Sequence, residues 1–295
     1  MVPYRPALRW HGGKWLLAPW IISHFPQHRV YVEPFGGAAS VLLRKPRSYA
    51  EIYNDLDDEA VNLFRVLRSD EASRLIEDLR LTPFSRSEFS IAYDRCEDPV
   101  ERARRLVVRS FMGFGGDAVK NRTTGFRNDS NRSGGPPAKD WANYPDCVPA
   151  LVERLQGVVV ESRPASYVIT KFDGDDTLFY VDPPYIHGSR DKPGNGKLPR
   201  HTYEFELTDD DHAELLAQLR SAAGMVVLSG YPSDLYDDLL SDWWRVTRVA
   251  MADGARERTE VLWINPKATA ALDELRHAER GSLFASLHRP AEAAA

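Results

Sequence analysis

Five short, strongly apolar segments alternate along this chain with stretches whose apolar residues recur at helical spacing. They cover residues 30–33, 49–53, 158–161, 177–181 and 225–229. Strands that are separated by helical crossovers pair in parallel, so the alternation predicts a doubly wound α/β sheet. Two further segments, residues 245–252 and 260–265, are expected to close the sheet as a strand pair.

Helical patterns fill the intervals between these strands. Residues 58–79 have apolar side chains at helical spacing and predict one helix. Thr208 followed by Asp211 predicts a capped helix start, with Leu215, Leu216 and Leu219 as its buried stripe. Residues 234–240 predict a short helix, and residues 293–295 a frayed tail.

Length and composition limit the class of protein. The chain has 295 residues, of which 43% are hydrophobic and 27% charged, and this excludes disorder throughout. No run approaches the roughly 20 apolar residues that span a bilayer. The first ten residues also lack the apolar run of a secretory signal. We therefore expect a soluble, cytoplasmic protein without a membrane partner.

Cysteine and histidine residues follow no metal-binding pattern. Cys96 and Cys147 are far apart and have no ligand partners at short spacing, so neither a disulfide nor a zinc knuckle is expected. His187, His201 and His212 lack acidic or cysteine residues at ligand spacing. We expect ordinary thiols and no metal requirement.

Charge is distributed unevenly along the chain. The formal net charge is −5, which by itself argues weakly against a nucleic-acid partner, yet residues 101–139 contain nine basic and three acidic residues. An acidic body with a basic insert is typical of a protein that binds a polyanion. A solvated basic helix followed by a loop would account for the same charges.

The loop within this basic segment is the candidate DNA contact. Residues 110–116 are aromatic and glycine-rich, and a long loop with little apolar periodicity follows them. Lys120, Arg122, Arg127 and Arg132 are the residues that we expect to contact DNA phosphates. A surface loop without a ligand is the alternative.

A glycine pair follows the first strand. Gly36 and Gly37 allow a tight turn with close approach of the backbone to a ligand, and Asp55 after the second strand could accept hydrogen bonds from ribose hydroxyls. The full dinucleotide fingerprint is missing, because Ala38 and Ala39 follow the pair. A glycine-rich turn without a ligand is the alternative.

Glu33, at the end of the same strand, discriminates between two cofactors. A carboxylate is a poor neighbour for a pyrophosphate and a good one for an ammonium or sulfonium group. S-adenosylmethionine therefore ranks above a dinucleotide, and an NAD-linked oxidoreductase is the less favoured interpretation.

The motif Asp182-Pro183-Pro184-Tyr185 follows the fourth strand directly. Proline donates no hydrogen bond and fixes φ, so the Pro183 carbonyl and the Asp182 carboxylate can converge. Two acceptors beside an aromatic ring suit the exocyclic amino group of a base, on which Tyr185 would stack. An amino nitrogen held in this way can become tetrahedral and attack a methyl group. A strand that ends in a plain Pro-Pro turn is the alternative.

The order of these motifs resembles that of Dam-type DNA adenine-N6 methyltransferases, particularly their phage and prophage branch. The resemblance runs from about residue 8 to residue 265 and rests on Trp10-His11-Gly12-Gly13-Lys14, residues 31–37, Tyr53-Asn54-Asp55, residues 182–185 and Leu228-Ser229-Gly230-Tyr231. That family has a Rossmann-like methyltransferase domain with a mainly helical target-recognition insert. The resemblance therefore implies a catalytic domain of residues 1–80 and 151–266, an insert of residues 81–150, and a C-terminal extension of residues 267–295.

The resemblance also implies roles for individual residues. The cofactor S-adenosylmethionine would be held by Trp10, Gly12, Lys14, Glu33, Pro34, Phe35, Gly36, Gly37, Asp55 and Asp182. The catalytic residues Asp182, Pro183, Pro184 and Tyr185 would orient an adenine flipped out of the duplex, and Ser229 and Tyr231 would line its pocket. The stretch Glu161-Ser162-Arg163-Pro164 departs from the family pattern because it lacks the acidic residue often found beyond the strand of residues 158–161, which leaves contacts to the cofactor's adenine ring open.

We therefore predict a site-specific DNA methyltransferase that acts on adenine N6. Cytosine N4 offers similar chemistry in the same acceptor pair, and a non-catalytic DNA-binding protein that retains the fold is a second alternative. Methylation at cytosine C5 fits poorly, because it uses a cysteine that commonly follows proline, whereas Cys96 follows Arg95 and Cys147 follows Asp146. Restriction-linked, anti-restriction and regulatory roles fit the motifs alike.

Overall fold

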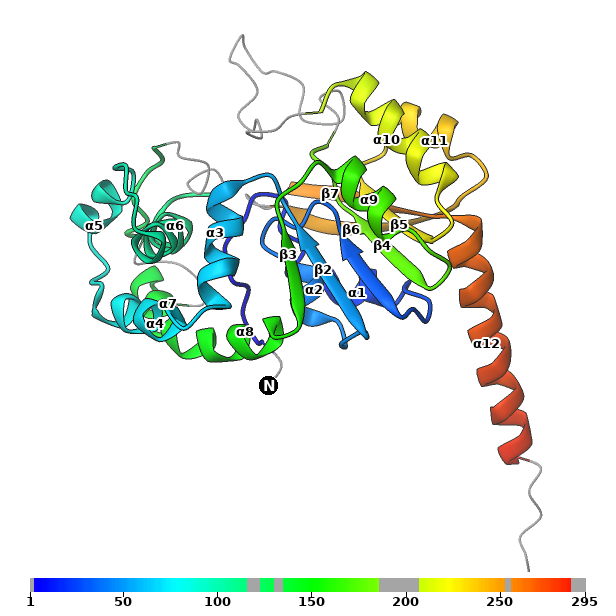
Figure 1. The fold of residues 1–295 in the computed structure, drawn as a ribbon, viewed down its shortest axis with the longest axis horizontal. Coiled ribbons are helices and arrows are strands. Elements are labelled where there is room, and N and C mark those ends of the chain that lie inside the picture. Colours follow the sequence, from blue (N-terminus) through cyan, green and yellow to red (C-terminus); the bar gives the residue numbers. More distant parts are fainter. Residues whose placement is uncertain (1–2, 116–122, 130–134, 186–206, 253–255, 288–295) are drawn as a thin grey trace, which may run out of the picture.

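The computed structural model describes residues 3–115, 123–129, 135–185, 207–252 and 256–287, and the backbone alone at residues 251, 252, 256 and 278–287 (Figure 1). Within these residues the chain forms a seven-stranded sheet of order β3-β2-β1-β4-β5-β7-β6. The strands are β1 (Val30–Glu33), β2 (Ala50–Asn54), β3 (Val158–Glu161), β4 (Thr177–Val181), β5 (Met225–Gly230), β6 (Trp244–Ala252) and β7 (Arg256–Ile264).

The first five strands are parallel, and β7 is antiparallel to both β5 and β6. The order of the parallel strands is that of a Rossmann-like sheet, as predicted. The closing pair of strands is also confirmed. The chain moves outward from β1 to β2 and β3, and from β4 to β5 in the other direction, so the switch point of the sheet lies between β1 and β4.

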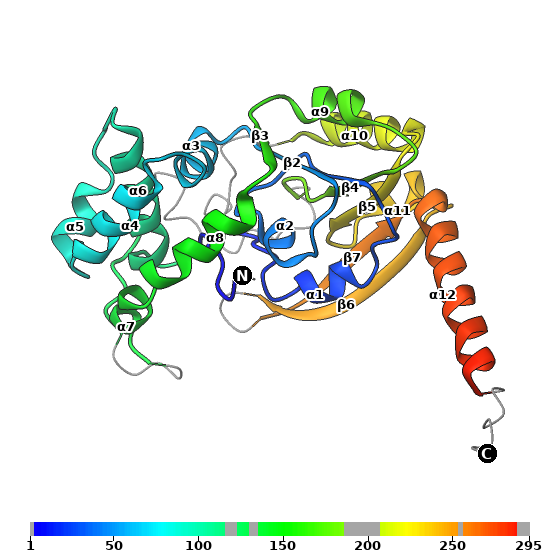
Figure 2. The same ribbon diagram turned by 60° about the horizontal axis from the view of Figure 1, so that its bottom comes forward.

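Helices cover both faces of the sheet. The helices α1 (Ala18–Ile22) and α2 (Ser40–Arg44) lie on one face, and α9 (Ala165–Phe172), α10 (Asp209–Ser221) and α11 (Asp234–Leu239) lie on the other (Figure 2). The predicted cap of α10 is confirmed, because the Thr208 hydroxyl accepts a hydrogen bond from Asp211 N at 3.1 Å and Asp211 Oδ2 accepts one from Thr208 N at 2.8 Å.

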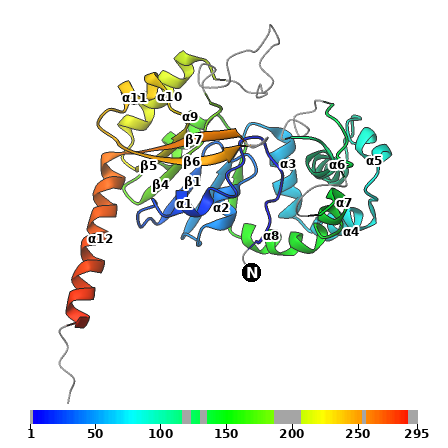
Figure 3. The ribbon, with the colours of Figure 1, turned by 180° about the vertical axis from the view of Figure 1, so that it is seen from behind.

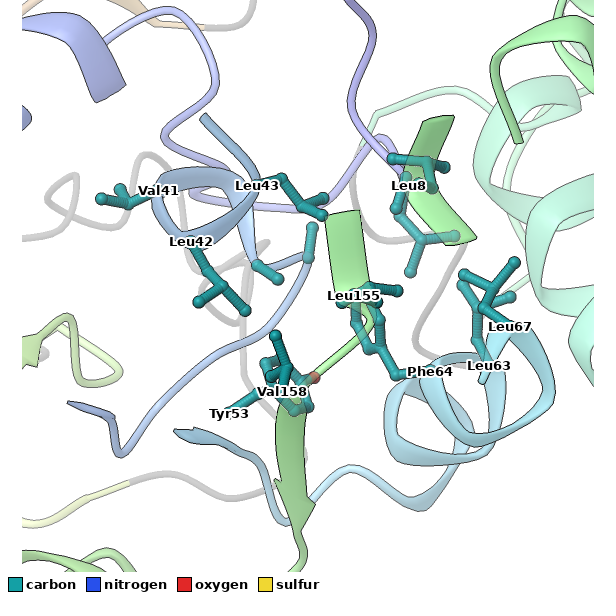
Figure 4. Close-up of a cluster of buried hydrophobic side chains, with 14 of the residues drawn as sticks. Leu8, Val41, Leu42, Leu43, Tyr53, Leu63, Phe64, Leu67, Leu155 and Val158 are labelled. Atoms are coloured by element: carbon teal, nitrogen blue, oxygen red, sulfur yellow. The ribbon is translucent and has the colours of Figure 1, made fainter. Parts of the chain in front are cut away.

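The side chains of the strands pack into two separate hydrophobic cores, one on each face of the sheet. Tyr31 and Tyr180 pack into the core on the side of α1 and α2, whereas Val32 and Val181 pack into the core beneath α9 and α10. Alternation along a strand explains this division, and burial on both sides explains why the central strands are almost continuously apolar. Figure 4 shows part of the first core, where α2, α3 (Asp58–Leu67) and β3 meet.

Mainly helical structure fills the interval between β2 and β3. After α3 come α4 (Ala72–Leu81), α5 (Arg86–Ile91), α6 (Pro99–Met112), α7 (Pro137–Ala142), the 3-10 turn η2 (Pro145–Cys147) and α8 (Val148–Leu155). They form a lobe beside the β3 edge of the sheet (Figures 1 and 2). Helices α3 and α4 pack against α6, so the helical lobe includes residues before the expected boundary at residue 81.

The single helix predicted over residues 58–79 is wrong, because α3 and α4 are separate. The break follows from Ser69, whose hydroxyl donates to Val66 O at 2.9 Å and accepts from Glu71 N at 3.2 Å. Such side-chain bonds compete with the helical ladder. Arg68 adds a tertiary constraint, since its guanidinium donates to the carbonyls of Leu155 and Val158.

The last described element is α12 (Pro266–Leu287), which occupies most of the expected C-terminal extension. Its first turns are anchored by Ala268 and Leu272, which are buried, and the helix then leads away from the sheet (Figure 3). The frayed tail expected at residues 293–295 lies outside the described residues. Among the described helices, none combines the length and apolar character needed to cross a bilayer.

Candidate active site

A pocket opens at the carboxyl ends of β1 and β4, the switch point at which ligands bind to sheets of this kind. Six parts of the chain that are separate in sequence meet there. The lining residues are Trp10, His11, Gly12, Gly13 and Lys14, then Glu33, Pro34, Phe35, Gly36, Gly37, Ala38, Ser40 and Val41, then Asp55, Leu56 and Asp57, and finally Ala165, Tyr180, Asp182, Pro184 and Leu207. Every residue expected to hold the cofactor is among them.

The turn after β1 is held by the end of β2. Gly37 N donates to Asp55 Oδ2 at 2.6 Å, and Gly36 N donates to the Asn54 carbonyl at 2.8 Å. Gly37 has a φ of +48°, and a Cβ on Gly36 would lie 2.2 Å from the Tyr53 ring. Both glycines are therefore required by the local geometry, and the turn packs directly against the tyrosine.

Asp55 supports this turn as well as facing the pocket. Its second carboxylate oxygen accepts from Asp57 N at 2.8 Å. Burial raises the pKa of Asp55, and the hydrogen bonds from Asp57 N and Gly37 N oppose that shift. The backbone of Leu56 is a third donor to this carboxylate, which has about four acceptor sites, so acceptor capacity remains for a hydroxyl of a ligand.

Glu33 is only 2% exposed at the base of the pocket. The Tyr31 hydroxyl and Leu42 N both donate to its Oε1, each at 2.7 Å. Burial nevertheless raises the pKa of Glu33 to about 8. The acid is therefore mostly protonated at neutral pH, and a cationic ligand would favour its charged form.

Asn54 ties three strand ends together, a role that the sequence motifs did not suggest. Its amide donates to the Pro34 and Arg163 carbonyls at 2.8 and 3.0 Å, and it accepts from Arg163 N at 2.9 Å. The segment after β3 is thereby drawn to the site, where Ala165 lines the pocket. An alanine thus contributes to the wall beyond β3, whereas Glu161, the acid at the end of that strand, lies outside the set of lining residues and pairs with Lys171 at 3.4 Å.

Asp182 is surrounded by donors from three parts of the chain. Ser229 Oγ donates to its Oδ1 at 2.7 Å, and the Tyr185 hydroxyl donates to the same oxygen at 3.1 Å. Lys14 Nζ lies 3.1 Å from Oδ2 and also donates to the Gly12 carbonyl at 2.7 Å. The predicted cofactor and base-binding residues therefore meet at one carboxylate.

Tyr185 adjoins the pocket through Asp182 and is itself 7% exposed. Its ring centroid lies 4.4 Å from that of Tyr231, with the planes at 60°, and Lys14 Nζ lies 4.8 Å from it. The Tyr185 hydroxyl also donates to Glu260 Oε2 at 3.4 Å. Glu260 was missed in the sequence, where its only signal is a single acid before the apolar run of residues 261–264.

Pro183 is buried and lies outside the set of lining residues, whereas Pro184 faces the pocket. Ser229 and Tyr231 join the site through Asp182 and Tyr185 respectively. Within the described ranges, His, Cys, Asp and Glu side chains form no group of three or more that could hold a metal ion.

Of the four predicted DNA contacts, Arg127 is the one that lies within the described residues. Lys120, Arg122 and Arg132 lie outside the described residues. Arg127 is 6% exposed and donates to the Phe111 carbonyl at 3.1 Å, while its backbone N donates to the Met112 carbonyl at 2.7 Å. This placement contradicts the phosphate contact that we expected of Arg127. Its guanidinium points into the lobe and binds the Phe111 carbonyl at the carboxyl end of α6.

The basic character of residues 101–139 is also reduced in the folded protein. Four of the nine basic residues lie on α6, and each pairs with a carboxylate of the same lobe. Arg102 pairs with Asp58 and Glu59, Arg104 with Glu88 and Glu101, Arg105 with Glu101, and Arg109 with Glu59. The local charge count therefore overstates the positive surface available to DNA.

The fold and the site define an α/β enzyme with a Rossmann-like sheet and a ligand pocket at its switch point. Residues 10–251 match the D12 class N6 adenine-specific DNA methyltransferase family, and the chain belongs to this family. The DNA adenine methylase of Salmonella typhi is 25% identical over 252 residues, covering 83% of this chain and 86% of that protein.

Two further relatives have the same description. The DNA adenine methylase of Escherichia coli (strain K12) is 27% identical over 222 residues, which are 72% of this chain and 76% of that protein. That of Serratia marcescens is 26% identical over 257 residues, which are 82% of this chain and 87% of that protein. The predicted fold class and activity are confirmed: the chain is an adenine-specific DNA methyltransferase. The cytosine-N4, oxidoreductase and non-catalytic alternatives are not supported.

Proposed function

We propose that the pocket between the ends of β1 and β4 binds S-adenosylmethionine, and that Asp182 orients an adenine flipped out of the duplex toward it. One observation carries this proposal: Asp182 lines the same pocket as Glu33 and Asp55. The acceptor for the amino group and the residues expected to hold the cofactor thus share one cavity. Methyl transfer needs such proximity, because attacking nitrogen and methyl carbon must meet in line.

The chemistry of the pocket fits this cofactor. Glu33 is a buried acid whose raised pKa an ammonium group would lower, and Asp55 retains acceptor sites for ribose hydroxyls. A Cβ on Gly36 would clash with the Tyr53 ring and one on Gly37 with the Trp10 ring, so the turn packs closely against these two side chains and lines the pocket with its backbone. Trp10 and Phe35 provide apolar surface beside these groups. When bound, S-adenosylmethionine supplies an electrophilic methyl group on a positively charged sulfur.

Asp182 and its neighbours prepare the target amino group. A base within duplex DNA cannot reach a carboxylate that lines a pocket, so the adenine must leave the stack. Asp182 and the Pro183 carbonyl would accept the two N–H bonds of N6, which favours the tetrahedral nitrogen needed for attack. Tyr185 would hold the ring by stacking. Lys14, whose Nζ lies 3.1 Å from Asp182 Oδ2, compensates the charge of the carboxylate.

The lobe between β2 and β3 is the part of the chain that we propose to contact DNA. Lys120, Arg122 and Arg132 are retained as phosphate contacts on grounds of charge. Arg127 is not retained, because its guanidinium is bound inside the lobe. In this proposal, residues 1–80 and 151–266 form the catalytic domain and residues 81–150 the target-recognition insert.

The test combines product and cofactor. Plasmid DNA from a host without adenine methylation is incubated with the protein and S-adenosylmethionine, and nucleosides are analysed by mass spectrometry. We expect N6-methyladenine, together with calorimetric binding of S-adenosylmethionine in the absence of DNA. Binding of NADH instead of S-adenosylmethionine would disprove the cofactor assignment. N4-methylcytosine as the product would disprove adenine as the target base but not the role of the acceptor pair.

A further inference from the structure

We infer that Glu260 is a positioning residue for methyl transfer, which accepts a hydrogen bond from the Tyr185 hydroxyl and thereby fixes the ring against which the adenine stacks. This inference rests on the stacking role proposed above for Tyr185. It concerns a residue on the antiparallel strand β7, outside the five motifs that indicated the function.

The position of Glu260 is unusual for a carboxylate. It precedes the buried run of residues 261–264 in β7, and the side chain is 8% exposed. A buried acid costs folding free energy unless it is bonded, so a charged residue at such a position indicates a requirement other than stability. Its Oε2 lies 3.4 Å from the Tyr185 hydroxyl.

The Tyr185 hydroxyl has one proton and two acceptors. Asp182 Oδ1 lies 3.1 Å away on the β4 side, and Glu260 Oε2 lies on the β7 side. Asp182 already accepts from Ser229 and pairs with Lys14, and in the proposed reaction it must also accept from the base. Glu260 gives the hydroxyl a partner that does not bind substrate, so the ring keeps its position as Asp182 changes partners.

The surroundings support an acceptor at this point. Burial and the charge of Asp182 raise the pKa of Glu260, whereas Lys14 and Arg258 lower it. Tyr231 packs against Tyr185 with ring centroids 4.4 Å apart, and the Arg258 guanidinium lies 5.2 Å from the Tyr231 ring centroid. The far end of the Tyr185 ring is therefore held by a hydrogen bond, and its side by another aromatic ring.

Four variants test the inference in single-turnover methylation of a duplex that carries a mapped target site. Glu260→Met removes the acceptor oxygens with little change in shape, and we expect a rate lower by about five- to tenfold, as for one lost hydrogen bond. Glu260→Gln keeps an acceptor oxygen and should stay within about twofold of the wild type. In a Tyr185→Phe background, Glu260→Met should cause no further loss, because the hydroxyl is absent. The affinity for S-adenosylmethionine should not change.

The outcomes separate this inference from the role of Tyr185 itself. Three results would overturn the inference. The rate of Glu260→Met could be unchanged, or Glu260→Met could slow the reaction equally in the wild type and in the Tyr185→Phe background. The third is a Glu260→Gln variant as slow as Glu260→Met. Full activity in Tyr185→Ala would instead overturn the stacking role.

The matched control is a second glutamate of β7. Glu257 is exposed, and we expect Glu257→Ala to methylate at the wild-type rate. Thermal melting of every variant verifies folding.

Discussion

Lys14 Nζ lies 3.1 Å from Asp182 Oδ2 and so joins the motif that precedes α1 to the motif that follows β4. The lysine side chain is 5% exposed and the aspartate side chain 18%, so the pair is largely removed from water. Each charge makes the burial of the other tolerable. The pair lies where the proposed cofactor and base sites adjoin, so we expect changes to it to affect both stability and activity.

Removing only one member of this pair should destabilise the protein. We expect Lys14→Met to lower the free energy of unfolding by about 1 to 3 kcal/mol, because Asp182 then remains partly buried without its counter-charge. Urea denaturation measures the change. The double variant Lys14→Met with Asp182→Asn should recover most of the loss, whereas a loss equal to the sum of the two single losses would show that the residues act independently.

The carboxylate of Asp182 should be required for the chemical step. We expect Asp182→Ala to slow single-turnover methyl transfer by about two to three orders of magnitude, the range for losing one preorganised electrostatic contact. Cofactor binding, measured by calorimetry, should largely survive because Glu33 and Asp55 remain. A fully active Asp182→Ala variant would disprove the mechanism.

Asp55 should matter to the cofactor through its own oxygens and through the turn that it supports. We expect Asp55→Ala to weaken S-adenosylmethionine binding by about 1 to 3 kcal/mol, since charge-assisted hydrogen bonds are lost. Asp55→Asn keeps one acceptor oxygen and should lose less. Unchanged affinity in a folded Asp55→Ala variant would remove this residue from the site.

The buried acid Glu33 should link cofactor binding to pH. Burial raises its pKa from 4.5 to about 8, so the folded protein holds a proton there that the unfolded chain releases. The contribution of Glu33 to stability should therefore fall as pH rises from 4.5 to 8, so the stability of Glu33→Gln relative to the wild type should rise over this range. At pH 7 the binding of S-adenosylmethionine should release a proton from Glu33.

Calorimetry in two buffers of different ionisation enthalpy measures that proton release. The apparent binding enthalpy should differ between the buffers for the wild type and much less for Glu33→Gln. A wild-type enthalpy that is the same in both buffers would show that the cofactor leaves the protonation of Glu33 unchanged.

The DNA-binding residues should separate into two groups. Neutralising Lys120, Arg122 and Arg132 together should weaken DNA binding and flatten the plot of log affinity against log salt by up to about 0.9 per lost phosphate contact. Arg127→Ala should instead lower thermal stability, because the guanidinium holds the Phe111 carbonyl inside the lobe. If Arg127→Ala changes the dependence of log affinity on log salt and the triple variant does not, then Arg127 contacts phosphate and the other three residues do not.

Local features of the sequence were sufficient for much of the fold. The central strands are recognisable because burial on both faces makes them continuously apolar, and Thr208 with Asp211 marks the start of α10. The glycine turn and the Asp-Pro-Pro-Tyr motif point to the site because their backbone chemistry is encoded in adjacent residues. The break between α3 and α4 escaped prediction, since Ser69 competes with the helix through bonds that periodicity does not reveal.

Only the tertiary structure decided which of these features face one another. Packing of the segment before α1 places Lys14 beside Asp182. Strand order places β7 beside β5, so that Glu260 reaches Tyr185 from a segment with no recognisable motif. The charge of the basic insert was likewise decided by folding, because carboxylates of the same lobe pair with the arginines of α6. A sequence determines its local periodicity and turn chemistry directly, whereas contacts between distant segments depend on how the strands and helices pack.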